Sequence, residues 1–177
     1  MNKKYFDDSE EACDEKLIEF NNKTGIFHDL ERIKGNEHRD FTGYTVNKLG
    51  ERTNWNIELK NRNVILMDNG TISGCSNSNK SYTGETLIIE NHKITDLLLD
   101  RIIGMEALYI NFTLDGYTII YNLSKLTKRP ERRFYNNIYS KGYEKKEDGR
   151  RQGLYLKDAA IYNKDYKLIK RSGEDFI

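Results

Sequence analysis

The sequence predicts an α+β fold, an α/β sandwich in which a mixed central sheet is flanked by helices. The main observation is the order of the hydrophobic patterns, which is a helix, several strands, a second helix and two further strands. A length of 177 residues allows one compact domain with a core and is too short for two ordinary domains. The 12 Tyr, 7 Phe and single Trp exclude a disordered chain, because disordered segments are poor in aromatic residues.

The first expected element is a helix over residues 9–22. It opens with a serine cap and acidic residues in the first turn, and Cys13, Leu17 and Phe20 recur at the spacing of one helical face. From 26 to 36 the apolar residues are sparse among charges, so this stretch fits either a strand or a loop.

Two strands are expected next, over 41–46 and 55–62. In the second, Trp55, Ile57 and Leu59 alternate with polar residues. This alternation is typical of a strand with one apolar face.

A hairpin and a loop are expected after these strands. Residues 64–67 prolong the second strand, and the Asp-Asn-Gly triplet at 68–70 is a hairpin turn that leads to a brief return at 71–72. Residues 73–84 are rich in Ser, Asn and Gly and predict a polar loop, long enough to contact a ligand.

The next predicted element is a helix that begins at residue 85 or 90 and ends at 103, with Gly104 as its C-cap. Residues 107–113 and 117–123 are nearly continuous apolar runs joined by a Leu-Asp-Gly turn. They predict a hairpin of central or well-covered strands.

Overall charge says little about partners, because 29 Lys and Arg balance 28 Asp and Glu to a net +1. The two cysteines, at 13 and 75, have no metal-ligand spacing, and no apolar run approaches a membrane span. The polar, acidic start of the chain is unlike a signal peptide. We therefore expect a cytoplasmic protein with free thiols and no membrane partner.

The candidate site lies on the predicted strand 55–62. Glu58 and Lys60 leave the same face of that strand, with Cα atoms about 6.6 to 6.8 Å apart. A carboxylate there can hold Mg²⁺, and the neighbouring ammonium can orient a water and offset charge on a phosphate. Asp40, just before the preceding strand, and the peptide carbonyl of Leu59 could supply further metal oxygens.

A solvated strand is the alternative, because Glu and Lys are abundant and acid-x-Lys pairs recur elsewhere in the chain. The context distinguishes Glu58 and Lys60 from those pairs. An alternating strand carries them, an isolated Asp followed by β residues precedes them, and a polar loop and a long helix follow.

The sequence resembles the PD-(D/E)XK nuclease superfamily, whose core order is αβββαβ. Asp40-Phe41-Thr42-Gly43-Tyr44 stands in place of the family's Asp strand, and Ile57-Glu58-Leu59-Lys60-Asn61-Arg62 in place of its E-x-K strand. The helix-like segment 86–100 and the hairpin 108–123 look like those of small phage or mobile-element members. Arg39 replaces the family's proline, which is often absent.

The resemblance implies a restriction-endonuclease-like core over residues 1–127 and a metal-dependent deoxyribonuclease. Asp40 and Glu58, with the Leu59 carbonyl, would be ligands of Mg²⁺ or Mn²⁺, and Lys60 the catalytic lysine. A Holliday-junction resolvase and a phage nuclease are both open, a homodimer is possible, and the location would be the host cytoplasm if a phage encodes the protein.

Accessory residues are less well defined. An acidic residue on the first helix often assists the metal in this superfamily, and Glu11, Glu15 and Glu19 share one helical face. On the second helix Lys93 could contact phosphate or be a surface lysine. Arg62 points to the same side as Lys60 and could grip the DNA backbone or be a solvent residue at the strand end.

A basic, Tyr-rich extension over residues 128–177, packed on the same domain, could bind DNA. Its segment 128–151 holds nine basic and four acidic residues with interleaved tyrosines, which can neutralise phosphates and stack on bases. A surface hairpin or helix is equally plausible. The remaining expected DNA contacts are Lys80, Arg129, Arg132, Arg133, Lys145 and Lys146. Short terminal strands are expected near 153–156 and 159–162, and a tail from 170.

Other functions are excluded or secondary. The three histidines show no zinc spacing, although His38 lies close to Asp40, and P-loop, dinucleotide-binding, hydrolase-elbow and metalloprotease motifs are absent. A non-catalytic binder with the nuclease fold, such as a phage-encoded inhibitor or DNA-binding accessory, is the first alternative. A phage structural or adaptor protein is the second.

Overall fold

The computed structural model describes the backbone of residues 3–34, 39–75, 81–99, 103–126, 132–134 and 150–170. Side chains are described for 11–34, 39–74, 84–99, 103–126 and 153–170. None of the described helices is long and apolar enough to span a membrane.

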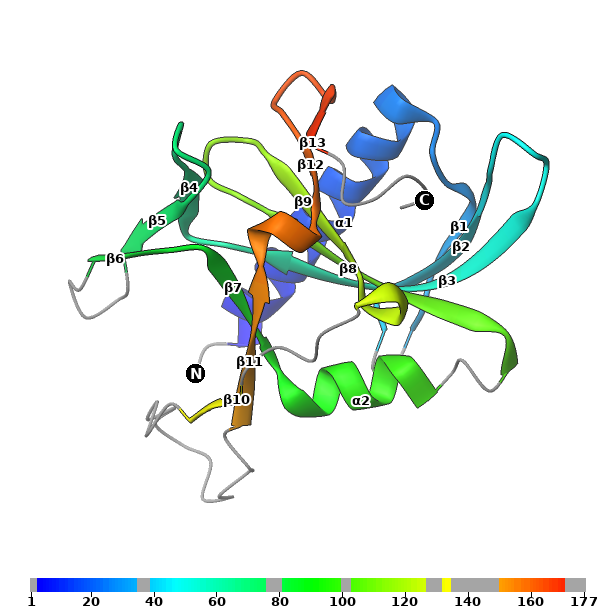
Figure 1. The fold of residues 1–177 in the computed structure, drawn as a ribbon. Coiled ribbons are helices and arrows are strands. Elements are labelled where there is room, and N and C mark those ends of the chain that lie inside the picture. The colour runs from blue at the N-terminus through cyan, green and yellow to red at the C-terminus, as the bar shows by residue number, and fades with distance from the viewer. Residues whose placement is uncertain are drawn as a thin grey trace.

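A seven-stranded mixed sheet forms the centre of the molecule (Figure 1). Its one parallel pair joins β3 to β8, and all its other neighbours are antiparallel. In spatial order the strands are β1 (His28–Arg32), β2 (Phe41–Val46), β3 (Arg52–Asn61), β8 (Met105–Phe112), β9 (Thr118–Asn122), β12 (Ala160–Tyr162) and β13 (Leu168–Lys170).

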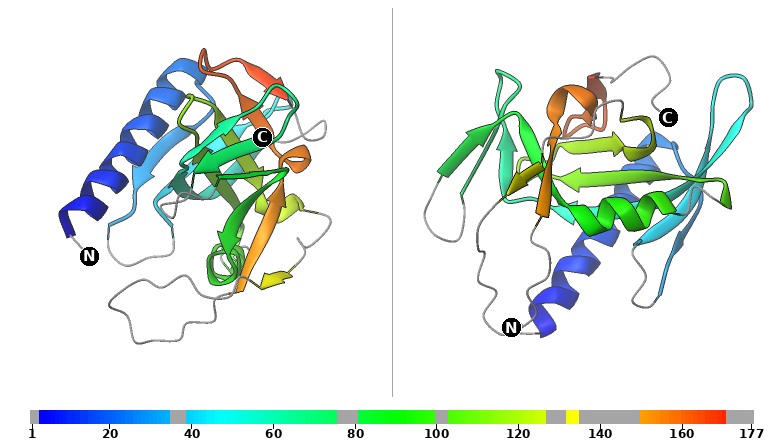
Figure 2. Two further views of the ribbon diagram at one scale, coloured as in Figure 1. Left: turned by 90° about the vertical axis from the view of Figure 1, so that its left-hand side faces the viewer. Right: turned by 60° about the horizontal axis from the view of Figure 1, so that its bottom comes forward.

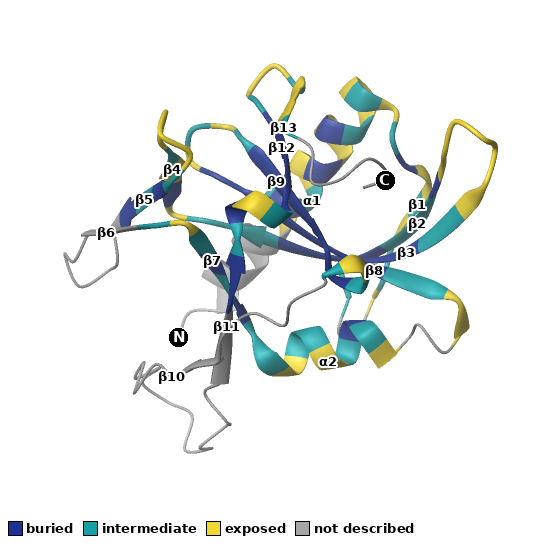
Figure 3. Cartoon of the chain, in the orientation of Figure 1, coloured by how far each residue is buried: buried dark blue, intermediate teal, exposed yellow. Residues whose placement is uncertain are grey.

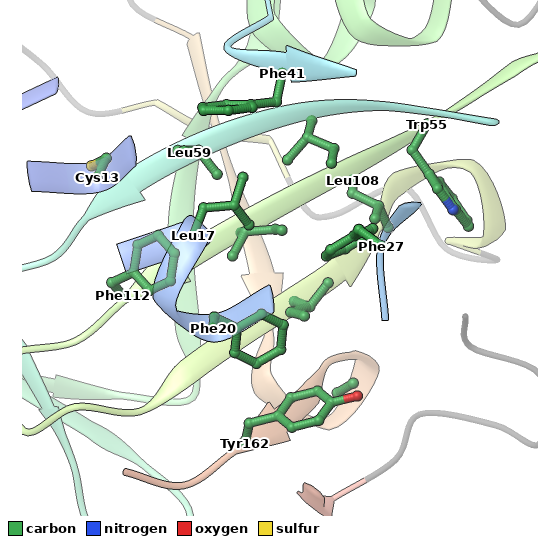
Figure 4. Close-up of a cluster of buried hydrophobic side chains, with 14 residues drawn as sticks. Cys13, Leu17, Phe20, Phe27, Phe41, Trp55, Leu59, Leu108, Phe112 and Tyr162 are labelled. Carbon is green, nitrogen blue, oxygen red and sulfur yellow. The ribbon is translucent and has the colours of Figure 1, made fainter. Parts of the chain in front are cut away.

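Two helices cover opposite faces of this sheet (Figure 2). The helix α1 (Lys3–Thr24) packs Leu17 and Phe20 against Ile57 of β3 and Leu108 of β8, in the core drawn in Figure 4. The helix α2 (Asn91–Leu99) contributes Leu97 to a second core on the other face. Ala107 and Tyr109 of β8 belong to this second core, so alternate residues of one strand supply the two cores.

Two three-stranded sheets complete the fold. One contains β10 (Arg132–Phe134), β11 (Arg150–Tyr155) and β7 (Thr86–Glu90), and the other contains β4 (Val64–Leu66), β5 (Ile72–Cys75) and β6 (Ser81–Gly84). Short 3₁₀ turns occur at Leu123–Lys125 and Leu156–Asp158. The C-terminal strands β11 and β12 pair with β7 and β9, so residues 150–162 pair with strands from the first 127 residues.

The predicted sandwich of a mixed sheet between helices is confirmed. The elements α1, β1, β2, β3, α2 and β8 follow the expected αβββαβ order, with β4 to β7 inserted between β3 and α2. The stretch 26–36, open between strand and loop, contains β1, and the terminal strands near 153–162 are present. The burial pattern in Figure 3 shows β8 and β9 as the covered strands that their apolar runs predict.

The first helix begins at Lys3 rather than near residue 9, so Ser9 lies inside α1 and is not its cap. Three further local predictions are wrong. Residues 64–67 do not prolong β3, because the chain leaves the main sheet after Asn61 and β4 pairs with β5 instead. The predicted polar loop over 73–84 is too long, because its two ends belong to the strands β5 and β6, which pair antiparallel.

The third concerns the start of the second helix. Residues 86–90 form β7, in which Leu87 and Ile89 are buried and their neighbours are not, a period of two rather than of a helix. Among the two predicted starts, only the later one agrees with α2. The described part of α2 ends at Leu99, and the expected capping glycine, Gly104, has a positive φ of 83° immediately before β8.

Candidate active site

The strand pair β2–β3 places Asp40 against the segment that carries Glu58 and Lys60. Phe41 lies opposite Ile57 in the antiparallel register. One residue earlier, the Asp40 amide donates to the Ile57 carbonyl at 2.9 Å, and the Asp40 carboxylate Oδ2 accepts from the Leu59 amide at 2.7 Å. These two bonds flank Glu58, so the aspartate is fixed on the backbone of the E-x-K strand.

Glu58 points away from α1, toward the face covered by α2. Its neighbours Ile57 and Leu59 are in the α1 core, and Glu58 itself is only 4% exposed. The Glu58 carboxylate Oε1 forms an ion pair with the Lys93 ammonium of α2. A buried carboxylate that keeps its charge needs such a partner, because burial alone would favour the neutral acid.

Lys60 is half-buried and lies beside Asn111 of β8 in the parallel register. Glu58, two residues earlier, lies beside Tyr109. Asp40 and Lys60 both act electrostatically on the buried thiol of Cys13. The pKa of that thiol is raised chiefly by burial, while the Asn61 backbone lowers it and Asp40 raises it. The bond from the Leu59 amide to the Asp40 carboxylate places the aspartate beside the residue that precedes Lys60 in β3.

Arg62 lies on the Glu58 side of the sheet, as its spacing predicts, and bonds to groups of the protein. Its guanidinium donates to Asn111 Oδ1 at 2.9 Å, to the Tyr109 hydroxyl and to the Ile88 carbonyl of β7. Burial raises the pKa of Tyr109 to about 12, with Arg62 opposing the shift. Arg62 therefore ties the end of β3 to β8 and β7.

Three residues that the sequence did not single out for the site lie around Asp40, and one of them, Arg32, contacts its carboxylate directly. Arg32 of β1 contacts the Asp40 carboxylate at 3.7 Å and the Asp40 carbonyl at 3.3 Å, and its Nε donates to Asp14 of α1 at 2.6 Å. Arg39, at the position of the family's proline, donates to Asn56 Oδ1 at 3.0 Å.

Among the described side chains of α1, the acidic residue that reaches the site is Asp14, through Arg32. Glu11 and Glu15 are exposed, and Glu19 accepts from the Tyr166 hydroxyl at 2.5 Å. A signal was available in the sequence, because Asp14 directly follows Cys13 in the buried stripe of the helix whereas the glutamates lie farther from it.

Most of the expected DNA contacts cannot be placed. Lys80, Arg129, Lys145 and Lys146 lie outside the described residues, as does His38. Arg132 and Arg133 belong to β10, paired with Gln152 and Arg151 of β11, and their side chains are not described.

The donor chemistry of the site fits a hard cation. Glu58 and the Leu59 carbonyl on β3, with Asp40 bonded to the Leu59 amide, offer oxygen atoms, which are the ligand type that Mg²⁺ and Mn²⁺ take. Across the described side chains, no three His, Cys, Asp or Glu residues form a group that could hold a metal. Protein carboxylates alone would therefore leave the ion with ligands to be supplied by carbonyl, water or substrate oxygens.

Comparison with known proteins gives one weak similarity of fold. No protein-family model and no curated protein matches the chain. Among solved structures, the chain is similar to Hjc, a Holliday junction resolvase from the archaeal hyperthermophile Archaeoglobus fulgidus, with a TM-score of 0.39 and 16% sequence identity. The similarity covers 61% of this chain and 66% of that chain, so this chain spans just under two thirds of that protein.

Proposed function

We propose that the protein is a metal-dependent deoxyribonuclease that hydrolyses phosphodiester bonds, with a branched junction as one candidate substrate. The observation that carries this proposal is the position of Asp40, bonded through its carboxylate to the Leu59 amide between Glu58 and Lys60. An αβββαβ core with this strand pair is what the sequence resemblance implies. A homodimer and a phage source remain predictions.

Each residue would have a distinct task. Asp40 and Glu58, with the Leu59 carbonyl, would hold Mg²⁺ or Mn²⁺, and the ion would stabilise charge on the phosphate and lower the pKa of a water. Lys60, half-buried at the same end of β3, would orient the attacking water and offset phosphate charge. Asp14 and Arg32 would position Asp40 rather than take part in the chemistry.

The test is cleavage of duplex and four-way-junction DNA with Mg²⁺, Mn²⁺ or EDTA. We expect metal-dependent cleavage by the wild-type protein and a loss of at least about a hundredfold in Lys60→Ala, as for removal of a general acid–base group. Glu58→Gln should abolish cleavage while keeping the shape of the side chain. Lys48→Ala, in the exposed β2–β3 turn, is the matched control, and circular dichroism checks that each variant is folded.

A non-catalytic binder with the same fold is the second candidate. The ion pairs of Glu58 with Lys93 and of Asp40 with Arg32 favour it, because both candidate ligands already have cationic partners. Junction or duplex binding that survives in EDTA, without cleavage under any metal condition, would support the binder. Cleavage that persists in both Glu58→Gln and Lys60→Ala would reject the proposed site.

A further inference from the structure

The ion pair between Glu58 and Lys93 connects the candidate metal ligand to the helix above it. The Glu58 side chain is 6% exposed and the Lys93 side chain 28% exposed, so water can screen the pair only in part. Lys93 is therefore a close counter-charge for the Glu58 carboxylate inside the protein.

The position of Lys93 on its helix follows from the packing of α2. Lys93 lies in the first turn and Leu97, which is buried in the α2 core, lies four residues later. Side chains at this spacing share one helical face, so the contact that anchors α2 also directs Lys93 toward Glu58. The long, flexible side chain of Lys93 can also turn its ammonium toward solvent without any movement of the helix.

A divalent cation and the Lys93 ammonium would compete for the same carboxylate. Two cations at hydrogen-bond distance from one oxygen repel each other strongly where water is largely excluded. At Asp40 the contact with Arg32 is longer, 3.7 Å, and Arg32 has a second carboxylate, Asp14, at 2.6 Å. Competition at Glu58 is consequently the stronger of the two.

We propose that Lys93 is the counter-cation of Glu58 while the site is free of metal, and that a divalent cation replaces it and releases the ammonium to contact the DNA backbone. This inference rests on the proposed function, since it takes Glu58 to be a metal ligand. Metal binding and phosphate contact would then be coupled, because the Lys93 ammonium that leaves Glu58 becomes available to the substrate.

The first experiment measures Mn²⁺ binding to the full chain, without DNA, by isothermal titration calorimetry. Lys93→Met should bind Mn²⁺ about tenfold more tightly than the wild-type protein, because a competing charge is removed. Lys48→Met, an exposed lysine, should bind like the wild-type protein, and Glu58→Gln should lose the binding. If Lys93→Met does not fold, Lys93→Gln keeps a hydrogen-bond donor without the charge and should show the same gain.

The second experiment follows the released amine directly. Wild-type protein is labelled with an amine-acylating reagent with and without Mn²⁺, and the modification of each lysine is read by peptide mass spectrometry. We expect Mn²⁺ to raise the labelling of Lys93 several-fold and to leave Lys48 unchanged.

The outcomes separate the two proposals. If Mn²⁺ binds through Glu58 but neither the affinity of Lys93→Met nor the labelling of Lys93 changes, the exchange is wrong and the metal site stands. If neither wild-type protein nor Lys93→Met binds Mn²⁺ in a Glu58-dependent way, the metal site and the exchange are both wrong.

Discussion

Replacing Arg62 by methionine tests whether this residue holds the fold together or contacts DNA. The guanidinium donates to Asn111 Oδ1, the Tyr109 hydroxyl and the Ile88 carbonyl. Asn111 and Tyr109 are fully buried, so water cannot take over their lost bonds. The methionine keeps the aliphatic part of the side chain and removes only the donors.

The expected cost follows from the groups left unpaired. A buried acceptor without a partner costs about 1–3 kcal/mol, so three acceptors, with partial relaxation at Ile88, predict a loss of about 3–5 kcal/mol in the free energy of unfolding. With an m-value of about 2 kcal/mol per molar urea, the midpoint should fall by about 2 M. Trp55, which is 1% exposed, gives a fluorescence signal for the transition.

The control is Arg52→Met, because Arg52 is exposed and stacks on Tyr44 at 3.8 Å without buried acceptors. It should lower the unfolding free energy by no more than about 1 kcal/mol. An Arg62→Met protein that unfolds at the wild-type midpoint and yet binds DNA more weakly would refute the structural role. Arg62 would then contact the DNA backbone, which is the alternative that its position in the sequence also allows.

Three further changes test the packing of the molecule. Leu17→Ala, which removes a fully buried side chain of α1, should cost about 2–5 kcal/mol in urea unfolding, and a loss below about 1 kcal/mol would contradict the α1 core. Gly43→Ala should cost about 1–3 kcal/mol, since its Cβ would lie 3.0 Å from Leu30 Cδ2 and 3.1 Å from the His28 carbonyl; wild-type amide-exchange protection of β1 would contradict this crowding. Because the pKa of Tyr109 rises from 10.0 to about 12 in the folded protein, its contribution is complete below pH 10 and falls by about 1.4 kcal/mol per pH unit between pH 10 and 12. Tyr109→Phe should show a shallower alkaline decline, and equal slopes would contradict a buried neutral phenol.

Much of the architecture could be predicted because its patterns are long and local. The alternation of Trp55, Ile57 and Leu59 indicates β3 and its buried face, and the apolar runs on both sides of the Leu-Asp-Gly turn indicate the β8–β9 hairpin. The hydrophobic pattern gave a wrong prediction where a strand is followed directly by a helix. The strand β7, which contains Leu87 and Ile89, is followed directly by α2. The apolar residues of the two elements together resemble the pattern of one longer helix.

The candidate site could be predicted in its residues but not in its partners. The spacing of Glu58 and Lys60 is visible in one strand, whereas the pairing of Glu58 with Lys93 depends on how α2 crosses the sheet. The link from Asp14 through Arg32 to Asp40 likewise joins α1, β1 and β2 across 26 positions of sequence, from 14 to 40. The position of Asp14 next to the buried stripe of α1 distinguishes it from the exposed glutamates, but a single sequence does not show that Arg32 would join it to Asp40.

The parallel pairing of β3 with β8 also determines when the site can form during folding. The β2–β3 and β8–β9 hairpins need only short loops, but β3 and β8 meet through a connection that contains two small sheet segments and a helix. Closing so long a loop is slow, and contacts across it are formed late. The Arg62–Asn111 bond spans this parallel seam, and the Glu58–Lys93 pair needs the same connection to fold back on β3. We therefore expect partly folded chains to contain both hairpins and to lack the assembled site, so that the Glu58–Lys93 pair would form only in the last kinetic phase of refolding.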